Sequence, residues 1–386
     1  MTTVDETRAA LAALLRPRDA REPVTVLGAG RDDLDAGRAY LVALADGGWA
    51  VPTWPLEYGG RDANPEEAAV VARELARFEQ PDLYPFLVGI GVVGPTLLTC
   101  ASKEQQSRWL PAIRSGAEIW CQLFSEPGAG SDLAGLATRA ERDGDIWRVT
   151  GQKVWSSRAH YAKWGFLLAR TDPTVPKHSG ITAFAIDMQA PGVDIRPLRQ
   201  MNGDAHFSEV FLEDAAVSDS DRIGDVGAGW NVTRTALANE RGAVGAAGTG
   251  MGSPAERLLE LCRDRAVDPV ARDRVTSVHV MSEVNRLTTR RARDAAKAGT
   301  PGPEGSGAKL RGGELFKETA RTALGLLGAA GSLDEGEWST LFLTAPSISI
   351  RGGTDEIQRN IVGERVLGLP VEPRTDADRP WNELPH

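Results

Sequence analysis

The hydrophobic period of this 386-residue sequence changes twice, and this restricts the fold more than any other feature. Apolar residues recur at helical spacing from residue 5 to about 114, and again from about 225 to 367. Between about 119 and 217 the period falls to two, in short β-branched and aromatic runs separated by Gly, Asp and Pro. Helices, then strands, then helices predict an α+β protein. We expect domains at 1–118, 119–224 and 225–386, the last with a polar tail that lies over a surface or frays.

Composition narrows the class of protein. A hydrophobic share of 41% and a charged share of 25% are ordinary for a globular chain, and the net charge of −9 disfavours binding to nucleic acid. The three cysteines lie far apart without a CxxC pair, which predicts neither a metal site nor a disulfide framework. We see no signal peptide and no run of about 18 apolar residues. These features predict a cytoplasmic protein without a membrane span.

The stretch 120–157 carries the features that most suggest a ligand. It contains the segment PGAGSD at 127–132, here called the glycine turn, and then a hairpin-like pair of β-segments that ends in Trp155 and two serines. Gly128 and Gly130 would let backbone N–H groups approach a phosphate or a ring edge. Trp155 would offer a flat apolar wall with hydroxyl groups beside it. Taken by itself, the glycine turn is weak evidence for a ligand, because most such turns are only turns.

Several ordered segments resemble the acyl-CoA dehydrogenase family. They are WPLEYGG, SEPGAGSDLAG, GQKVWSS, FLLARTDP, EVFLEDAAV and GGTDEIQRNIVGERVLGLP, spread over 48–370. They are most similar to actinobacterial members with GGT, rather than EGT, in the last motif. The resemblance implies an N-terminal helical domain, a central β-barrel and a C-terminal four-helix bundle. It also implies an FAD oxidoreductase of fatty acid or steroid metabolism, which converts an acyl-CoA to its 2-enoyl thioester and passes electrons to an electron-transfer flavoprotein.

The resemblance also implies which residues bind FAD. The matching positions are Gln122, Phe124, Ser125, Gly130, Ser131, Trp155, Ser157, Thr354 and Glu356. The first three would edge the isoalloxazine ring, and Gly130 and Ser131 would meet the ribityl phosphate region. Trp155 and Ser157 would close the other side of the ring, although a core tryptophan is the alternative at Trp155.

Thr354 and Glu356 stand at the start of the last predicted helix. The resemblance implies that these two positions contact the FAD phosphate and ribose, and a helix N-terminus is also a favourable place for an anion. Glu356 would repel a phosphate, and we expect it to serve as a helix cap or a ribose contact.

The resemblance implies a catalytic base at a position other than the one most family members use. Many family members carry it as a glutamate at the position of Gly352, which cannot take a proton. A second subset carries it in an LxxER motif, and 237–241 matches that motif, so Glu240 is the candidate base. Arg241 would orient the carboxylate or lower its pKa; the alternative is a charged pair on a solvated helix face. Gly352 keeps the N–H that would polarise the thioester carbonyl.

Other positions depart from the family pattern. The arginine-x-x-Phe-Gly segment that reaches a neighbouring subunit's FAD is missing near Arg263, and Gly325 replaces a glutamine with the same role. Ala238 replaces an acid that meets the CoA adenine in the family, so the protein would hold CoA differently or the acyl group would arrive on a carrier protein. Three functions stay open: a dehydrogenase in a homo- or hetero-oligomer (dimer or tetramer), a flavin monooxygenase or oxidase, and a partner-dependent or non-catalytic subunit of a mixed complex.

Overall fold

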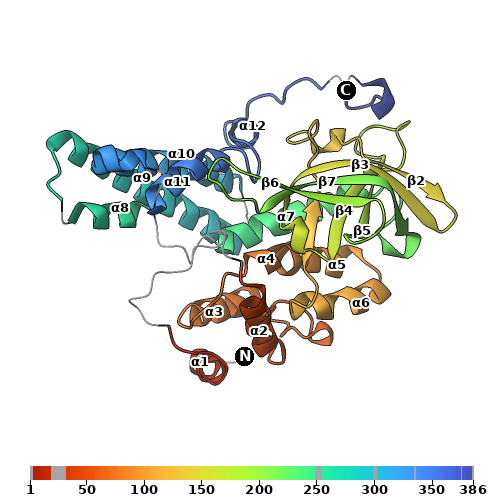
Figure 1. Ribbon diagram of the computed structural model, residues 1–386, viewed down its shortest axis with the longest axis horizontal. Coiled ribbons are helices and arrows are strands. Elements are labelled where there is room, and N and C mark those ends of the chain that lie inside the picture. Colours follow the sequence, from red (N-terminus) through yellow and green to blue (C-terminus); the bar gives the residue numbers. More distant parts are fainter. Residues whose placement is uncertain are drawn as a thin grey trace. The chain divides into compact units, whose positions relative to one another are not determined.

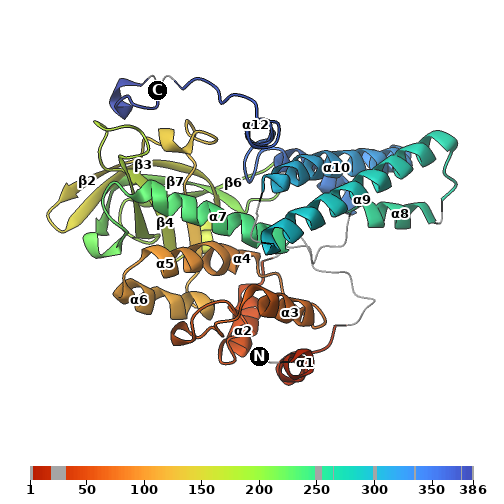
Figure 2. The same ribbon diagram turned by 180° about the vertical axis from the view of Figure 1, so that it is seen from behind.

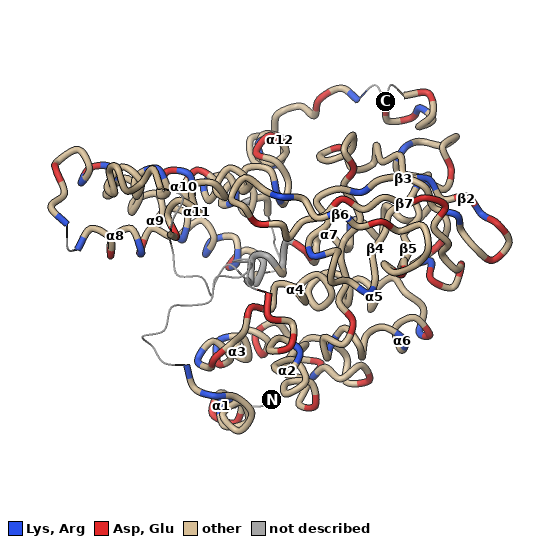
Figure 3. Tube along the Cα trace, in the orientation of Figure 1, with Lys and Arg blue, Asp and Glu red and all other residues tan. Residues whose placement is uncertain are grey.

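The computed structural model describes residues 3–18, 32–247, 254–263, 265–298, 302–333, 336–374 and 376–384. Its contacts divide the chain into two compact units. Unit 1 consists of Met1–Arg199, Ala205–Met251 and Thr375–His386, and unit 2 of Gln200–Asp204 and Gly252–Arg374. Figure 3 shows acidic and basic residues interspersed along the helices and strands of both units.

Unit 1 begins with a set of helices (Figure 1). They are α1 (Val4–Ala12), α2 (Leu34–Ala45), α3 (Pro65–Leu75), α4 (Tyr84–Leu87), a π-helix (Val88–Val93), α5 (Gly94–Cys100) and α6 (Lys103–Arg114). Capping boxes with side chains from Thr3, Asn64 and Ser102 begin α1, α3 and α6. The π-helix interrupts what the sequence pattern predicts as one helix, because Pro95 in the next turn has no N–H to continue the ladder.

The strands of unit 1 form one eight-stranded sheet. They are β1 (Trp120–Leu123), β2 (Arg139–Asp143), β3 (Ile146–Ser157), β4 (Trp164–Arg170), β5 (Ile181–Asp187), β6 (Val193–Leu198), β7 (Phe207–Ser218) and β8 (Arg222–Ile223). Their order is β6-β7-β3-β2-β4-β5-β8, with β1 beside β4. The antiparallel β2–β3 pair turns at Gly144, whose φ is +62°, and confirms the predicted hairpin.

Tryptophans join the helices to the sheet. Trp109 of α6, Trp120 of β1 and Trp164 of β4 lie with their ring centroids 5.4 to 5.9 Å apart, and all three are buried. Edge-to-face and stacked contacts of this kind add to the burial of apolar area. They place the start of β1, and hence the segment that follows it, on a rigid base.

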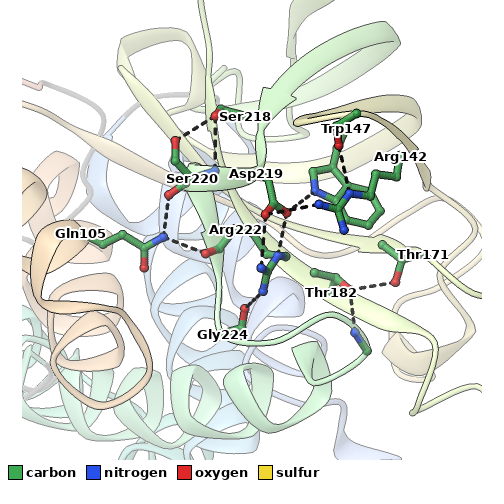
Figure 4. A network of polar contacts seen from close by, with 12 residues as sticks. Gln105, Arg142, Trp147, Thr171, Thr182, Ser218, Asp219, Ser220, Arg222 and Gly224 are labelled. Carbon is green, nitrogen blue, oxygen red and sulfur yellow. Dashed lines mark hydrogen bonds and ion pairs between the residues drawn. The ribbon is translucent and has the colours of Figure 1, made fainter.

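A polar network makes a second junction between α6 and the sheet (Figure 4). Asp219 accepts hydrogen bonds from Trp147 Nε1 at 2.8 Å and from Arg222 Nε at 2.9 Å. Gln105 Nε2 of α6 donates to the backbone carbonyls of Ser220 and Arg222 at 2.8 and 2.7 Å. The short connection between β7 and β8 is therefore fixed from both sides.

The helix α7 (Gly229–Ala247) follows the sheet and belongs to unit 1. It contacts the π-helix, α5 and β5 (Figure 2). The approach to the π-helix is close, because a Cβ added to Gly91 would lie 2.7 Å from the Cβ of Ala243. Glycine at that position brings α7 against the π-helix.

Unit 2 is helical. It contains α8 (Pro254–Arg263), α9 (Pro269–Lys297), α10 (Glu304–Leu327), α11 (Gly336–Ile348) and α12 (Asp355–Arg365). The central helix α10 contacts the other four, around a core that includes Leu258, Val278, Leu315 and Trp338. No helix in the ranges described above is both long and apolar enough to cross a membrane.

Candidate active site

The glycine turn follows β1 directly and is open on its outer side. Glu126 and Ala129 exchange two backbone hydrogen bonds, of 3.0 and 3.1 Å, that close the turn. A Cβ added to Gly128 or Gly130 would meet no atom within 4 Å, and neither residue has a positive φ. The protein's own packing therefore does not require glycine at either position. Open space beside exposed backbone is what a ligand that approaches the main chain needs.

A buried ion pair fixes the start of the glycine turn. The fully buried Lys153 donates from Nζ to Glu126 Oε1 at 2.7 Å and to the carbonyl of Phe124 at 3.2 Å. Glu126 also accepts the N–H groups of Ala137 and Thr138 at 2.7 and 3.0 Å. Burial raises the pKa of Glu126, but Lys153 and these hydrogen bonds outweigh it, so the pKa lies below its ordinary value and the carboxylate is charged.

The structure excludes the core alternative for Trp155, whose side chain is 59% exposed. Its φ is +60°, a left-handed conformation that is rare outside glycine, and it lies where the β3–β7 register shifts between Lys153 and Ser156. The irregularity leaves Lys153 and Ser156 buried while Trp155 points outward, with its edge against Phe207 at 5.9 Å. Ser157, at the end of the strand, is half-buried.

The candidate base lies beside one of the predicted ring-edge residues. Glu240 of α7 is half-buried, and Gln122 Nε2 of β1 donates to its Oε2 at 3.3 Å. The preceding Asn239 donates to Thr96 Oγ1 of α5 at 3.1 Å, which fixes the rotation of α7 about its axis. Glu240 therefore faces β1 and does not lie on a freely solvated helix face. Arg241 lies in α7, and its side chain is outside the described residues.

Phe124 and Ser125 differ in what they could offer a ligand. The Phe124 side chain is buried and packs against Phe166 at 5.2 Å, so only its backbone could meet a ligand. Ser125 is half-buried, and its carbonyl accepts the N–H of Val154 at 2.9 Å. This hydrogen bond ties the segment before the glycine turn to the strand that carries Trp155.

Gly352, Thr354 and Glu356 lie together at the start of α12 in unit 2. Gly352 has a φ of +67°, which would strain a glutamate, and among the described residues its N–H has no acceptor. Thr354 is the N-cap of α12, and its Oγ1 accepts a first-turn N–H at 3.3 Å. Glu356 lies inside the helix, exposed and 3.6 Å from Arg359, so the prediction that it could be the cap is wrong. Thr354 stands at the N-cap position, from which its side chain can accept a first-turn N–H, whereas Glu356 lies within the first turn itself.

Sequence reasoning missed Lys153 and Glu126, although both lie within the stretch that it selected. A lysine in the middle of a predicted strand of a central sheet is a weak signal of a buried ion pair. The alternation of the strand places position 153 on the same buried face as Trp147 and Val149, but it cannot show which carboxylate pairs with a lysine there.

Comparison with known proteins identifies the family. Models of the N-terminal, middle and C-terminal domains of acyl-CoA dehydrogenases match 24–117, 121–215 and 227–367 in order. Acyl-CoA dehydrogenase FadE34 of Mycobacterium tuberculosis is 44% identical over 332 residues, which cover 85% of this chain and 46% of FadE34. The chain thus spans less than half the length of that relative. Acyl-CoA dehydrogenase IpdE1 of the same organism is 37% identical over 385 residues, covering 96% of this chain and 99% of IpdE1.

The solved structures agree. The steroid ACAD Tcur3481–Tcur3483 has 31% identity and a TM-score of 0.78, over 95% of this chain and 96% of that one. The predicted order of an N-terminal helical, a middle β and a C-terminal helical domain is confirmed. The chain belongs to the acyl-CoA dehydrogenase family of flavoprotein oxidoreductases.

Proposed function

We propose that this protein catalyses the FAD-dependent α,β-dehydrogenation of an acyl-CoA to the 2-enoyl thioester. Glu240 takes the α-proton on its carboxylate. Bound FAD supplies the acceptor for the β-hydrogen, which leaves as hydride, so the substrate loses one proton and one hydride in all. Gly352 donates its N–H to the thioester carbonyl, which makes the α-proton more acidic.

The hydrogen bond between Gln122 and Glu240 carries this proposal. A general base must lie within reach of the carbon whose proton it takes, and that carbon must lie against the flavin ring. Gln122 is the ring-edge candidate on β1, and its amide is 3.3 Å from the Glu240 carboxylate. The Gln122 amide would hold the Glu240 carboxylate in one orientation. Glu240 is half-buried, so less water surrounds its carboxylate than at a fully exposed position.

The residues of unit 1 fit FAD. The glycine turn leaves open space at Gly130, and the exposed Ser131 follows it, so the ribityl phosphate region would fit there. Trp155 presents an exposed indole that would cover one side of the isoalloxazine ring, with the half-buried Ser157 beside it. In unit 2, the N-terminus of α12 at Thr354 is suited to the FAD phosphate or ribose.

We propose a narrower class of substrate than acyl-CoAs in general. The similarity to the steroid ACAD Tcur3481–Tcur3483 supports an acyl group that is bulky and ring-bearing, carried on CoA. Electrons would leave through an electron-transfer flavoprotein, in the cytoplasm, from an oligomer of this chain or of this chain with a related one.

The test is anaerobic titration of the purified protein with straight-chain, branched and steroidal acyl-CoAs, monitored by flavin absorbance. We expect bleaching with the steroidal class. The Glu240→Gln variant should bind the same thioester and bleach roughly 10²- to 10⁴-fold more slowly. Glu260→Gln, the same change at an exposed position of α8, is the matched control and should behave as the wild type.

Other outcomes would change the assignment. Glu240→Gln that bleaches at the wild-type rate would place the base elsewhere. Protein that is colourless alone but yellow after co-expression with a related chain would make it a partner-dependent subunit. Reduced flavin that reacts rapidly with oxygen to give peroxide would favour an oxidase.

A further inference from the structure

The two ends of the glycine turn are each held by a buried lysine. Lys153 holds Glu126 at the start, and Lys177 Nζ lies 2.7 Å from Asp132 Oδ2 at the end. The Lys177 side chain is 7% exposed, whereas that of Asp132 is 64% exposed. In the middle of the turn Ala129 is buried in the core, whereas a Cβ added at Gly128 or Gly130 would meet no atom within 4 Å. The two ion pairs therefore hold the ends of a turn whose glycines are not held by packing.

Lys177 binds a second carboxylate, from the far end of the chain. Asp376 Oδ2 lies 2.5 Å from its Nζ. Asp376 begins the segment 376–384, here called the C-terminal strap, and two N–H groups of the strap donate to the carbonyls of Val175 and Pro173 at 2.9 and 3.0 Å. Burial lowers the pKa of Lys177, but the two carboxylates outweigh it and leave the pKa above its ordinary value. The strap thus completes the charge pairing of the lysine that holds the turn.

The strap also covers the residues just after the glycine turn. Trp381 Nε1 donates to the carbonyl of Gly135 at 3.3 Å, and the Trp381 ring lies 4.3 Å from the Arg170 guanidinium. Arg170 is buried and donates to the carbonyls of Ala134 and Leu136 at 2.7 and 3.1 Å. The ring shields these charge-assisted hydrogen bonds from water.

We propose that the C-terminal strap is a positioning element of the cofactor site. It holds the glycine turn, through Asp376 and Trp381, in the conformation in which Gly130 and Ser131 receive the phosphate end of FAD. This inference rests on the proposed FAD binding at that turn. A turn that is ordered before the ligand arrives loses less conformational entropy on binding, so affinity depends on the strap although the strap does not touch the ligand.

The experiment compares Asp376→Asn and Trp381→Ala with the wild type as apo-protein. Asp378→Asn is the matched control, since Asp378 is exposed on the same strap and has no interaction with the described residues. We expect the dissociation constant for FAD to rise about tenfold in each of the two variants. Amide hydrogen exchange at 129–136 should accelerate in both, while exchange in β5 stays as in the wild type.

Two comparisons separate positioning from general stability. Riboflavin lacks the phosphates, so its affinity should fall by less than that of FAD. Trp381→Phe keeps a ring over Arg170 but loses the donor to Gly135, and should show an intermediate effect on exchange at 129–136. Asp376→Asn is the smaller change and keeps the test valid if Trp381→Ala does not fold.

The outcomes test the strap proposal and the proposed function separately. Unchanged FAD affinity and unchanged exchange in Asp376→Asn and Trp381→Ala would overturn the strap proposal. A wild type that does not bind FAD would overturn the proposed function. Exchange at 129–136 in the apo-proteins would then still decide whether the strap orders the turn, with acceleration supporting it and no change overturning it.

Discussion

Replacing Lys153 by methionine tests whether a buried ion pair determines the start of the glycine turn. Methionine fills much of the same volume without the charge, so the variant leaves the Glu126 carboxylate with two backbone N–H donors and no hydrogen-bonded cation. Lys153 is fully buried and Glu126 is 8% exposed, so little water can replace the lost partner. Breaking a buried pair by removing one member costs about 3–5 kcal/mol of unfolding free energy.

The chain provides a matched control. Lys163 Nζ and Asp187 Oδ2 are also 2.7 Å apart, but their side chains are 36% and 38% exposed. Lys163→Met should therefore cost at most about 1 kcal/mol. The double variant Lys153→Met/Glu126→Gln should recover about 1–2 kcal/mol relative to Lys153→Met, because an unpaired buried amide is less costly than an unpaired carboxylate.

The assay is urea unfolding of the apo-protein, monitored by tryptophan fluorescence. The dependence of the unfolding free energy on urea concentration is compared between variants. Both ion pairs join a lysine to a carboxylate at 2.7 Å, so the comparison tests the effect of burying the pair. Equal and small losses for Lys153→Met and Lys163→Met would refute the reasoning, as would a double variant that is less stable than Lys153→Met.

Three further predictions follow from single contacts. Hydrogen bonds from Arg222 and Trp147 lower the pKa of Asp219 to about 2, so its stabilisation, about 1–2 kcal/mol, should be complete above the unfolded pKa of about 3.9 and disappear as the pH falls towards 2. The difference in urea midpoint between wild type and Asp219→Asn, measured from pH 6 to pH 2, checks this, and a constant difference would contradict it. Trp155→Ala should leave the unfolding midpoint unchanged but weaken FAD binding in a fluorescence titration; a large loss of stability would mean that the indole is buried after all. Gln122→Leu should lower kcat about tenfold with little change in KM for the thioester, since the amide orients the Glu240 carboxylate beside the flavin ring; an unchanged kcat in steady-state assays would count against that role.

Local patterns predict much of this fold. The helix start at Ser102 follows from its capping residue, and the hairpin before Trp155 follows from a period of two around Gly144. Glu240 is selected by its LxxER motif. Each of these signals lies within a few residues of the feature that it predicts.

The anchors of the candidate site could not be predicted in this way. Trp381 and Gly135 are 246 residues apart in sequence, and nothing in a polar tail indicates which carbonyl its indole will reach. Of the two alternatives for the tail, the described segment 376–384 lies over a surface, which is formed by 173–177 and by the residues just after the glycine turn. The outward position of Trp155 depends on a left-handed backbone at a non-glycine residue, which no propensity favours.

The central claim is that Glu240 takes the α-proton beside a flavin bound at the 120–157 stretch. The most direct measurement is the single-turnover rate of flavin reduction by a steroidal acyl-CoA, in stopped flow without oxygen, for the wild type and Glu240→Gln at saturating thioester. We predict a rate that falls roughly 10²- to 10⁴-fold in the variant while the thioester still binds. Reduction of the variant at the wild-type rate would contradict the account.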